Sequence, residues 1–265
     1  MNIFLDKMKA LLGDEFDDFL KFYNSSGEHY RGLRVNTLKC SVEKLEKLLD
    51  FDLKSAPFCS ESFYIPNEIT SLGNNPLHHA GAFYIQEPSA SSAVTMEGDY
   101  VLDLCAAPGG KSTQIAAKLN SKGFLWSNEI VKNRANILLS NIERMGIRNA
   151  TVSNAYPEVL CDRLAGCFDK VLVDAPCSGE GMFRKDSTAE SEWSDEHVKS
   201  CAERQLKILN SAKNALKDGG VMVYSTCTFS VEENEGVIGR FLEENPDFKL
   251  EDANVNFGRP TLEYA

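Results

Sequence analysis

The second half of the chain alternates between two hydrophobic patterns. Short apolar runs typical of buried strands occur near residues 100–105, 124–128, 150–153, 169–174 and 220–226. Each run is followed by apolar residues at helical spacing, near residues 111–120, 131–145, 157–164, 195–217 and 231–244. Strands and helices that alternate in this order predict a parallel, doubly wound α/β sheet.

The first half of the chain is organised differently. Its pattern predicts, in order, one or two amphipathic helices, a strand, a helix and further strands, over residues 2–23, 32–38, 41–49 and 51–65. These elements predict a small α+β domain over residues 1–78 and a main α/β domain over residues 79–265. A strand end at Phe83–Ile85 and a helix entered at Pro88 would lead into the main sheet.

Composition places the chain among globular proteins. Its 265 residues are 43% hydrophobic and 25% charged, and no apolar run reaches the length of a membrane span. The opening residues do not resemble a signal peptide, so we expect a cytoplasmic protein without a membrane partner. The formal net charge of −11 argues against non-specific binding of nucleic acid by the whole surface but leaves room for a local basic groove.

The cysteines and histidines do not predict a metal site. None of the eight cysteines forms a C-x-x-C pair, which excludes a zinc ribbon and a thioredoxin motif. The neighbouring His78 and His79 would face different ways on either a helix or a strand. We therefore expect no bound metal and mostly buried, inert cysteines, with one or two reactive ones.

The stretch VLDLCAAPGGKST, residues 101–113, combines a buried strand, a glycine turn and the start of a helix. This order is typical of the nucleotide-binding corner of open α/β sheets, where glycines let a ligand approach the backbone. The loop matches neither G-x-G-x-x-G nor G-x-x-x-x-G-K-[ST], which disfavours a nicotinamide-dependent oxidoreductase or an ATP site. The loop leaves room for an adenosyl cofactor without phosphates. The simpler alternative is a tight turn of any α/β protein.

Two polar residues follow the next strands. Glu129 ends the second strand, twenty residues after Gly109, where an acidic side chain can accept hydrogen bonds from ribose hydroxyls. The same carboxylate could equally complement the dipole of the following helix. Asn154, after the third strand, is placed to meet an adenine ring, although an asparagine there is more often a turn residue.

Two cysteines follow the last two predicted strands. Asp174 and Cys177 lie in the loop DAPCSGEG after one strand, and Cys227 follows the other. Ser230 and Glu233 form an S-x-x-E capping box, which would start a helix just after Cys227 and favour its thiolate. Because both strands end at the same edge as the glycine turn, we expect the two cysteines and Asp174 to share one cleft. Either cysteine taken alone is more often a buried structural residue.

A nucleophilic thiolate beside an adenosyl cofactor suits methylation of a carbon that is not itself nucleophilic. In cytosine, addition of a thiolate to carbon 6 lets carbon 5 attack the methyl group of S-adenosylmethionine. A carboxyl group at ring nitrogen 3 would stabilise the adduct, and a base would then remove the carbon 5 proton. The residues alone do not choose between Cys177 and Cys227 as the nucleophile.

The chain resembles the Sun-domain RNA (cytosine-5) methyltransferases and is most similar to their bacterial ribosomal RNA branch. The resemblance covers nearly the whole chain and rests on LRVNTLK (33–39), AGAFYIQEPSA (80–90), DLCAAPGGKS (103–112), DAPCSGEGMFRKD (174–186) and YSTCTFSVEENE (224–235). It implies a Rossmann-like methyltransferase fold, S-adenosylmethionine as the cofactor and RNA as the substrate. Ribosomal RNA is favoured over transfer RNA.

The resemblance also implies roles for particular residues. Cys227 would be the nucleophile, Cys177 would assist release of the methylated base, Asp174 would hold the cytosine and Lys111 would lie in the cleft. The cofactor-binding residues would be Cys105, Ala106, Ala107, Pro108, Gly109, Gly110, Lys111, Glu129, Arg134, Asn154 and Asp174. Family members usually have an aspartate where this chain has Asn154.

The family's sheet normally continues with a further strand pair beyond the point where this chain stops, and the branch often adds a C-terminal RNA-binding domain. We therefore expect the chain to lack these parts and to have an unpaired sheet edge. The expected protein is a monomeric RNA cytosine-5 methyltransferase whose N-terminal domain contacts RNA, helped by Arg31, Arg34, Arg184 and Lys185. The alternatives are a transfer RNA cytosine-5 methyltransferase and a non-catalytic RNA-binding or ribosome-assembly factor that retains the fold.

Overall fold

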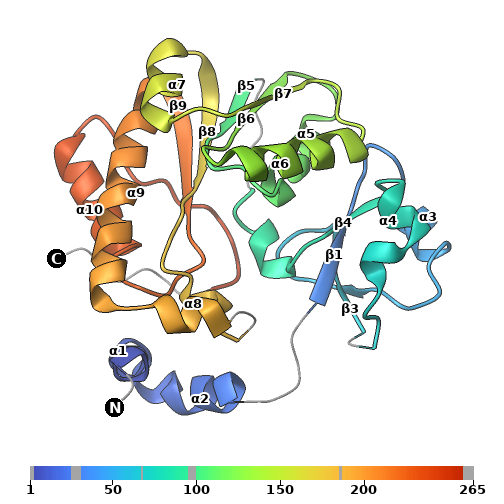
Figure 1. Ribbon diagram of the computed structural model, residues 1–265, viewed down its shortest axis with the longest axis horizontal. Helices are drawn as coiled ribbons and strands as arrows, with labels where there is room; N and C mark the ends of the chain where they lie inside the picture. Colours follow the sequence, from blue (N-terminus) through green and yellow to red (C-terminus); the bar gives the residue numbers. More distant parts are fainter. Residues whose placement is uncertain (1–2, 25–30, 67, 95–99, 185–186, 259–265) are drawn as a thin grey trace.

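The computed structural model describes residues 3–24, 31–66, 68–94, 100–184 and 187–258 of the chain. Its main domain is a five-stranded parallel sheet with the strand order β7-β6-β5-β8-β9 (Figure 1). The strands are β5 Tyr100–Asp103, β6 Phe124–Asn128, β7 Ala150–Ser153, β8 Phe168–Asp174 and β9 Leu216–Ser225. The helices that follow them in turn are α5 Gly110–Leu119, α6 Lys132–Arg144, α7 Pro157–Arg163, α9 Asp195–Ala215 and α10 Glu235–Glu244. The predicted doubly wound α/β sheet is confirmed.

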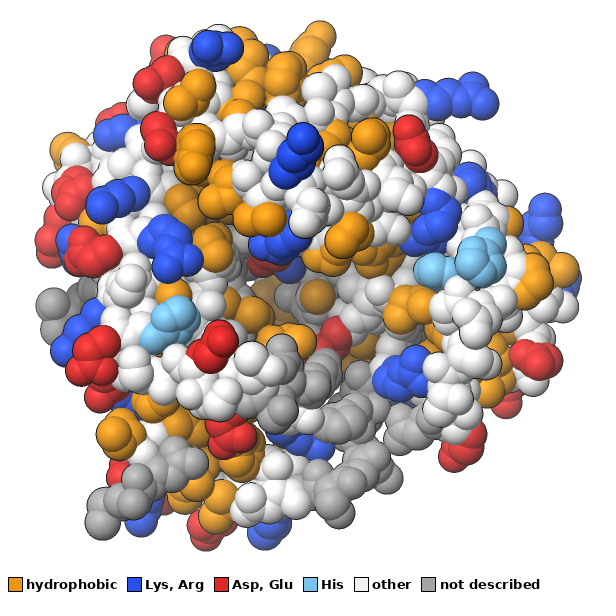
Figure 2. Space-filling model, viewed as in Figure 1, with side chains coloured by type: hydrophobic (Ala, Val, Ile, Leu, Met, Phe, Trp, Pro, Cys, Tyr) orange, Lys and Arg blue, Asp and Glu red, His pale blue; other side chains and the backbone are white. Residues whose placement is uncertain are grey.

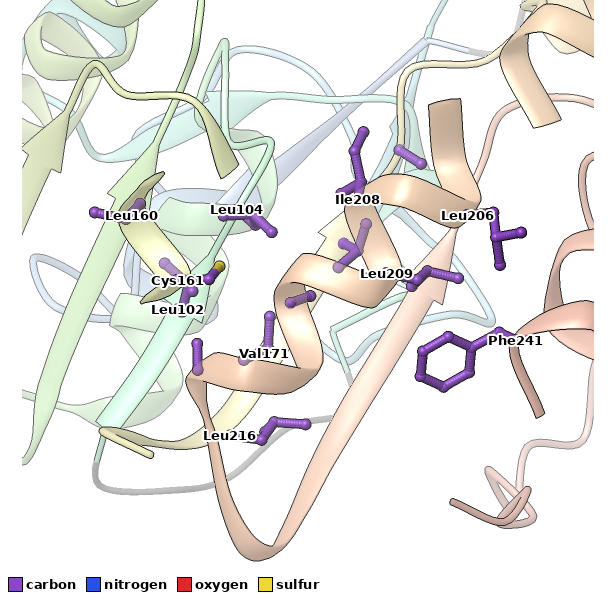
Figure 3. Close-up of a cluster of buried hydrophobic side chains, with 14 of the residues drawn as sticks. Leu102, Leu104, Leu160, Cys161, Val171, Leu206, Ile208, Leu209, Leu216 and Phe241 are labelled. Atoms are coloured by element: carbon purple, nitrogen blue, oxygen red, sulfur yellow. The ribbon is translucent and has the colours of Figure 1, made fainter. Parts of the chain in front are cut away.

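Helices cover both faces of this sheet, which explains why its strands are continuously apolar. Successive residues of β5 point to opposite faces of the sheet. Val101 packs in the hydrophobic cluster that contains residues of α5, and Leu102 packs in the cluster that contains residues of α7, α9 and α10. Figure 3 shows the second cluster, in which Val171 of β8 lies beside α9 and Phe241 reaches in from α10. No helix in the described part of the chain is long and apolar enough to cross a membrane.

The N-terminal domain contains a separate antiparallel sheet with the order β2-β3-β1-β4. Its strands are β1 Arg31–Val35, β2 Lys54–Ser55, β3 Ser62–Ile65 and β4 Phe83–Ile85, with three short helices, α3 Val42–Glu46, η2 Leu72–Asn74 and α4 Pro76–His79. Because β4 pairs with β1, this sheet extends past residue 78, so the boundary expected after that residue is too early. The helix expected at Pro88 is a single 3-10 turn, η3 Pro88–Ser91.

The first two helices pack far from the N-terminal sheet. Helices α1 Ile3–Leu12 and α2 Phe16–Asn24, joined by η1 Gly13–Glu15, lie beside the short helix α8 Ser187–Glu192 (Figure 1). We call these two helices the N-terminal hairpin. Phe4 is buried against Phe183 and Trp193, with ring centroids 4.9 and 6.0 Å away. The predicted amphipathic helices are confirmed, and their apolar face covers a segment that lies between the two candidate cysteines in the sequence.

The side chain of Arg34 in β1 is buried in the interface between the two domains. Its side chain is 1% exposed, and its guanidinium donates to Gln86 Oε1 at 3.0 Å, to the Gly110 carbonyl oxygen at 3.0 Å and to Thr113 Oγ1 at 2.7 Å. Burial lowers the pKa of Arg34 to about 10. The expectation that Arg34 contacts RNA is therefore wrong, because its alternating position in β1 points it into the interface with the first turn of α5.

Replacing this guanidinium should weaken folding. Arg34→Met keeps an unbranched side chain but removes the donor to Gln86 Oε1, to the Gly110 carbonyl oxygen and to Thr113 Oγ1, so we expect the free energy of unfolding to fall by about 3 kcal/mol. Urea denaturation measures the loss. Arg148→Met, the same change at an exposed site, is the control and should stay within about 0.5 kcal/mol of the parent. A similar small change in both proteins would contradict the bridging role of Arg34.

Candidate active site

The carboxyl ends of the parallel strands surround a cleft. A cavity of about 980 Å³ lies at this edge, and a smaller pocket of about 230 Å³ adjoins it through the shared residues Cys105, Ala107 and Asp174. The face of the molecule drawn in Figure 2 is hollowed near its centre. Since the strands run parallel, the turns after β5, β6, β8 and β9 all open at this edge.

Most of the predicted site residues line these two spaces. The larger cavity is lined by Cys105, Ala107, Glu129, Arg134, Asp174, Cys177 and Cys227. The smaller pocket is lined by Cys105, Ala106, Ala107, Pro108, Gly110, Lys111 and Asp174. Gly109 and Asn154 line neither. Gly109 precedes α5 with a φ of +112°, a left-handed conformation that side chains other than glycine rarely adopt.

The turn after β5 is held in place from α6. Arg134 Nη2 donates to the Ala107 carbonyl oxygen at 2.8 Å, and Asn141 Nδ2 donates to the Pro108 carbonyl oxygen at 2.8 Å. Arg134 also lies 3.4 Å from the carboxylate of Glu129. One arginine thus ties the glycine turn to the end of β6.

Glu129 is 4% exposed and forms one side of the larger cavity. Its Oε1 accepts a hydrogen bond from the Val131 backbone N–H at 2.9 Å, so it does interact with the start of α6. Beside it, the apolar residues Ile130 and Tyr156 are 49% and 65% exposed and line the same cavity. The exposed Asn154 donates from Nδ2 to the Glu129 carbonyl oxygen at 2.7 Å, which fixes the backbone on which this carboxylate stands.

Asp174, at the end of β8, is held by two neighbours. Lys111 Nζ lies 2.7 Å from its Oδ2, and Ser225 Oγ donates to its Oδ1 at 2.8 Å. Both partners follow from sheet geometry, because Lys111 lies in the first turn of α5 and Ser225 pairs with Asp174 across β8 and β9. The carboxylate is thereby fixed in orientation at the junction of the two pockets.

The two candidate cysteines meet in the cleft. Cys177 Sγ lies 3.2 Å from Cys227 Sγ, and Cys227 is the more exposed of the two. The contact with Cys177 holds the pKa of Cys227 below its ordinary value. The same contact, together with burial, raises the pKa of Cys177. Together with the greater exposure of Cys227, this direction of the pKa favours Cys227 as the thiolate.

The helix argument for the Cys227 thiolate is wrong. Helix α10 begins at Glu235 rather than at residue 231, and residues 231–234 form a turn. The Ser230 hydroxyl accepts from the Glu233 N–H at 3.3 Å, as a capping box requires, but the Glu233 carboxylate does not return the bond. It accepts from the Ser178 N–H at 3.0 Å and from Gln205 Nε2 at 2.7 Å instead. The stronger charge-assisted bonds across the loops outcompete the local cap.

The sequence reasoning missed three residues that line the smaller pocket, namely Asp103, Tyr84 and Gln86. Asp103 is fully buried, its Oδ2 accepts from Ser112 Oγ at 2.6 Å, and its Oδ1 has no partner. Burial, with Asp174 nearby, raises its pKa to about 7. The signal in the sequence was the position of Asp103, a charged residue within the apolar run of β5. Tyr84 and Gln86 lie within the motif AGAFYIQEPSA (80–90), which was the signal for them.

The cleft fits an adenosyl cofactor with an amino-acid tail. An acidic side chain beside exposed apolar residues suits a ribose and a base, and the unpartnered Asp103 Oδ1 suits a cationic group. In the described part of the chain, no three His, Cys, Asp or Glu side chains have an arrangement that could hold a metal ion.

Comparison with known proteins agrees with this geometry. The chain superposes on the crystal structure of NSun6 from Pyrococcus horikoshii with SFG, an analogue of S-adenosylmethionine, with a TM-score of 0.85 at 27% identity over 97% of this chain and 90% of that one. A methyltransferase homolog protein from Pyrococcus horikoshii gives a TM-score of 0.83 at 31% identity over 98% and 83%. The fold is the Rossmann-like fold of S-adenosylmethionine-dependent methyltransferases, and the cleft lies where such a fold binds its ligand.

The family follows from the sequence match. Residues 93–261 match the family model of 16S rRNA methyltransferase RsmB/F, and residues 2–88 match the N-terminal domain of 16S rRNA methyltransferase RsmF. The chain belongs to this family of methyltransferases. It is 41% identical to ribosomal RNA small subunit methyltransferase F of Erwinia tasmaniensis over 92% of this chain and 54% of that protein, and 43% identical to that of Vibrio vulnificus over 88% and 52%. The chain thus spans about half the length of the curated relatives it matches.

The pKa of Asp103 predicts a pH-dependent stability. The folded chain keeps this proton up to about pH 7, whereas the unfolded carboxyl releases it near its ordinary value of 3.8, so folding stability should fall as pH rises across that interval. Asp103→Asn has nearly the same shape but cannot ionise. We expect the variant to gain stability relative to the parent from pH 4 to pH 7 in urea denaturation of the cofactor-free proteins. Parallel pH profiles would mean that Asp103 is ionised in the folded chain.

Proposed function

We propose that this chain is the catalytic part of an RNA cytosine-5 methyltransferase that acts on ribosomal RNA. The observation that carries the proposal is the contact between the two thiols, 3.2 Å apart, beside Asp174 at the edge of the cofactor cleft. A lone thiol would suit many reactions. Two thiols and an oriented carboxylate suit a reaction that needs a nucleophile, a hydrogen-bonding group for the base and help in releasing the product.

The cofactor would be held along the edge of the sheet. Glu129 is placed for the ribose, Ile130 and Tyr156 for the adenine, and Asp103 with Lys111 for the amino-acid tail. The glycine turn gives the cofactor access to the backbone, Arg134 fixes that turn, and Asn154 acts through the Glu129 backbone. When bound, S-adenosylmethionine supplies an electrophilic methyl group.

The protein's own groups then account for the activation of the base. The Cys227 thiolate adds to carbon 6 of cytosine, and the electron pair of the carbon 5–carbon 6 double bond becomes available at carbon 5. Asp174, oriented by Lys111 and Ser225, would accept a hydrogen bond from ring nitrogen 3 once that nitrogen takes up a proton in the adduct, and would thereby stabilise the adduct. After methylation the carbon 5 proton leaves to a base, the carbon–sulfur bond breaks, and Cys227 regains its thiolate. We assign assistance in this release to Cys177 because it lies beside the attacking sulfur.

Ribosomal RNA is proposed as the substrate from the names of the relatives, and transfer RNA is the alternative. A cytosine in structured RNA would have to be splayed out of its stack to reach Cys227. Of the arginines expected to contact RNA, Arg31 donates to the Ile69 carbonyl oxygen and Arg184 lies 3.9 Å from the centre of the Phe22 ring. Lys185 lies outside the described residues. We further propose a cytoplasmic monomer that needs no metal.

Methyl transfer should depend on the two thiols in different ways. With labelled S-adenosylmethionine and unmodified small-subunit ribosomal RNA, we expect 5-methylcytosine from the parent chain and none from Cys227→Ala. Cys177→Ala should accumulate a covalent RNA–protein complex, seen as a slow band on a denaturing gel. If the parent chain labelled transfer RNA and did not label ribosomal RNA, the substrate would be transfer RNA. RNA binding without label in any protein that still binds the cofactor would favour a non-catalytic RNA-binding factor.

Cofactor binding can be tested without RNA. Glu129→Gln removes the charge proposed to hold the ribose and should weaken S-adenosylmethionine binding by about tenfold or more in calorimetry. Glu46→Gln, at an exposed site on α3, is the matched control and should bind as the parent does. Equal affinities for all three proteins would remove Glu129 from the cofactor site.

A further inference from the structure

The loops that carry the two cysteines are tied together by a buried carboxylate. Glu180 is 4% exposed and lies three residues after Cys177. Its Oε2 accepts from the Phe229 backbone N–H at 2.9 Å, two residues after Cys227. Its Oε1 accepts from Trp193 Nε1 at 3.0 Å. One side chain therefore bonds the loop after β9 and the segment before α9.

Further bonds run parallel to this one. The Gly181 N–H donates to the Cys227 carbonyl oxygen at 2.9 Å, and a Cβ on Gly181 would lie only 2.7 Å from that oxygen. Ser178 and Thr228 share a hydrogen bond between their hydroxyls at 2.9 Å. The residue next to each cysteine is thus bonded to the opposite loop. These bonds link the two loops on either side of the sulfurs, and neither loop belongs to a strand or a long helix.

The N-terminal hairpin covers this network from outside. Phe4 packs edge-on against the ring of Trp193, whose Nε1 bonds Glu180, and Phe19 lies 6.3 Å from the ring of Phe229. Lys7 reaches from α1 to Asp195 at 2.6 Å and to Glu232 at 3.0 Å. The first helices of the chain thus pack against both residues that donate to Glu180, Trp193 and Phe229.

We propose that Glu180 is a positioning residue for the nucleophile: bonded to Phe229 and to the hairpin-covered Trp193, it fixes the Cys227 loop so that the two sulfurs stay in contact. Glu180 does not line either pocket, so it acts through the loop and not on a ligand. A glutamine in its place has one acceptor oxygen for the two N–H donors of Phe229 and Trp193. Its NH2 group would therefore face one of these donors and could not accept from it. The proposal rests on the proposed function only where it calls Cys227 the nucleophile.

The contact between the sulfurs has a measurable consequence. The contact with Cys177 lowers the pKa of Cys227, so losing that contact should raise it. A rise of about one unit lowers the thiolate fraction near neutral pH about tenfold. A change that only destabilises the fold would leave this pKa where it is.

The test is the pH profile of alkylation by iodoacetamide in the full 265-residue chain. Tryptic peptides 171–184 and 218–240 contain Cys177 and Cys227 as their only cysteines, so mass spectrometry can follow each thiol separately. We expect Glu180→Gln to shift the Cys227 midpoint upward, with alkylation about tenfold slower at pH 7 and unchanged at pH 10. Glu192→Gln, the same change at an exposed site on α8, should behave as the parent.

A second variant keeps the test decisive if Glu180→Gln does not fold. Trp193→Phe keeps an aromatic ring beside Phe4 but removes the Nε1 donor together with the second ring of the indole, and we expect a shift in the same direction of about threefold at pH 7. An unchanged Cys227 midpoint in a folded Glu180→Gln chain overturns the proposal, even if its melting temperature falls. If only Trp193→Phe folds, an unchanged midpoint in that variant overturns it. Because alkylation needs neither RNA nor cofactor, these outcomes are independent of whether the chain methylates ribosomal RNA.

Discussion

The parallel pairing of β8 with β5 on one side and β9 on the other is the constraint on which the site depends. Its register sets Asp103 opposite Leu172, and Asp174 opposite Ser225. Neighbouring strands lie about 4.8 Å apart, so the glycine turn, the Cys177 loop and the Cys227 loop leave the sheet within two strand spacings of each other. Residues of the candidate site that are separated by more than a hundred positions in the sequence are therefore brought together by backbone hydrogen bonds.

The N-terminal domain depends on the same edge. Gly110 is packed so closely that a Cβ there would lie 3.3 Å from Gln86 Nε2 and 3.5 Å from the Tyr84 ring. Arg34 donates to the Gly110 carbonyl oxygen from the opposite domain, and the guanidinium groups of Arg34 and Arg144 lie 6.0 and 5.7 Å from the centre of the Tyr84 ring. The turn that would hold the cofactor is thus a domain interface as well. A change in how the N-terminal domain sits would reach the cofactor through Gln86 and Gly110.

Much of this arrangement follows from local sequence. The five strands could be predicted because burial on both faces makes them continuously apolar, and the shared edge followed from their parallel direction. The meeting of Cys177, Cys227 and Asp174 was predictable for the same reason. The start of α10 was not, because the S-x-x-E pattern at Ser230 is locally satisfactory, whereas the actual partners of Glu233, Ser178 and Gln205, are distant in sequence. Arg34 was misplaced for a similar reason: sequence alone does not reveal that an arginine is buried when its partners are neutral acceptors on another domain.

The cleft carries features that oppose folding, whereas the loops with the two cysteines are held by hydrogen bonds. Tyr156 and Ile130 are exposed, and Asp103 is buried with an unpartnered oxygen. A ligand can relieve each of these, which is a reason for a binding site to keep them. The two cysteines are different, since they must remain chemically free and cannot be fixed by bonds of their own to the protein scaffold. Their order has to come from adjacent residues. Glu180 and Glu233 fit this role: Glu180 accepts from the Phe229 N–H in the Cys227 loop, Glu233 accepts from the Ser178 N–H in the Cys177 loop, and neither carboxylate lines the two pockets.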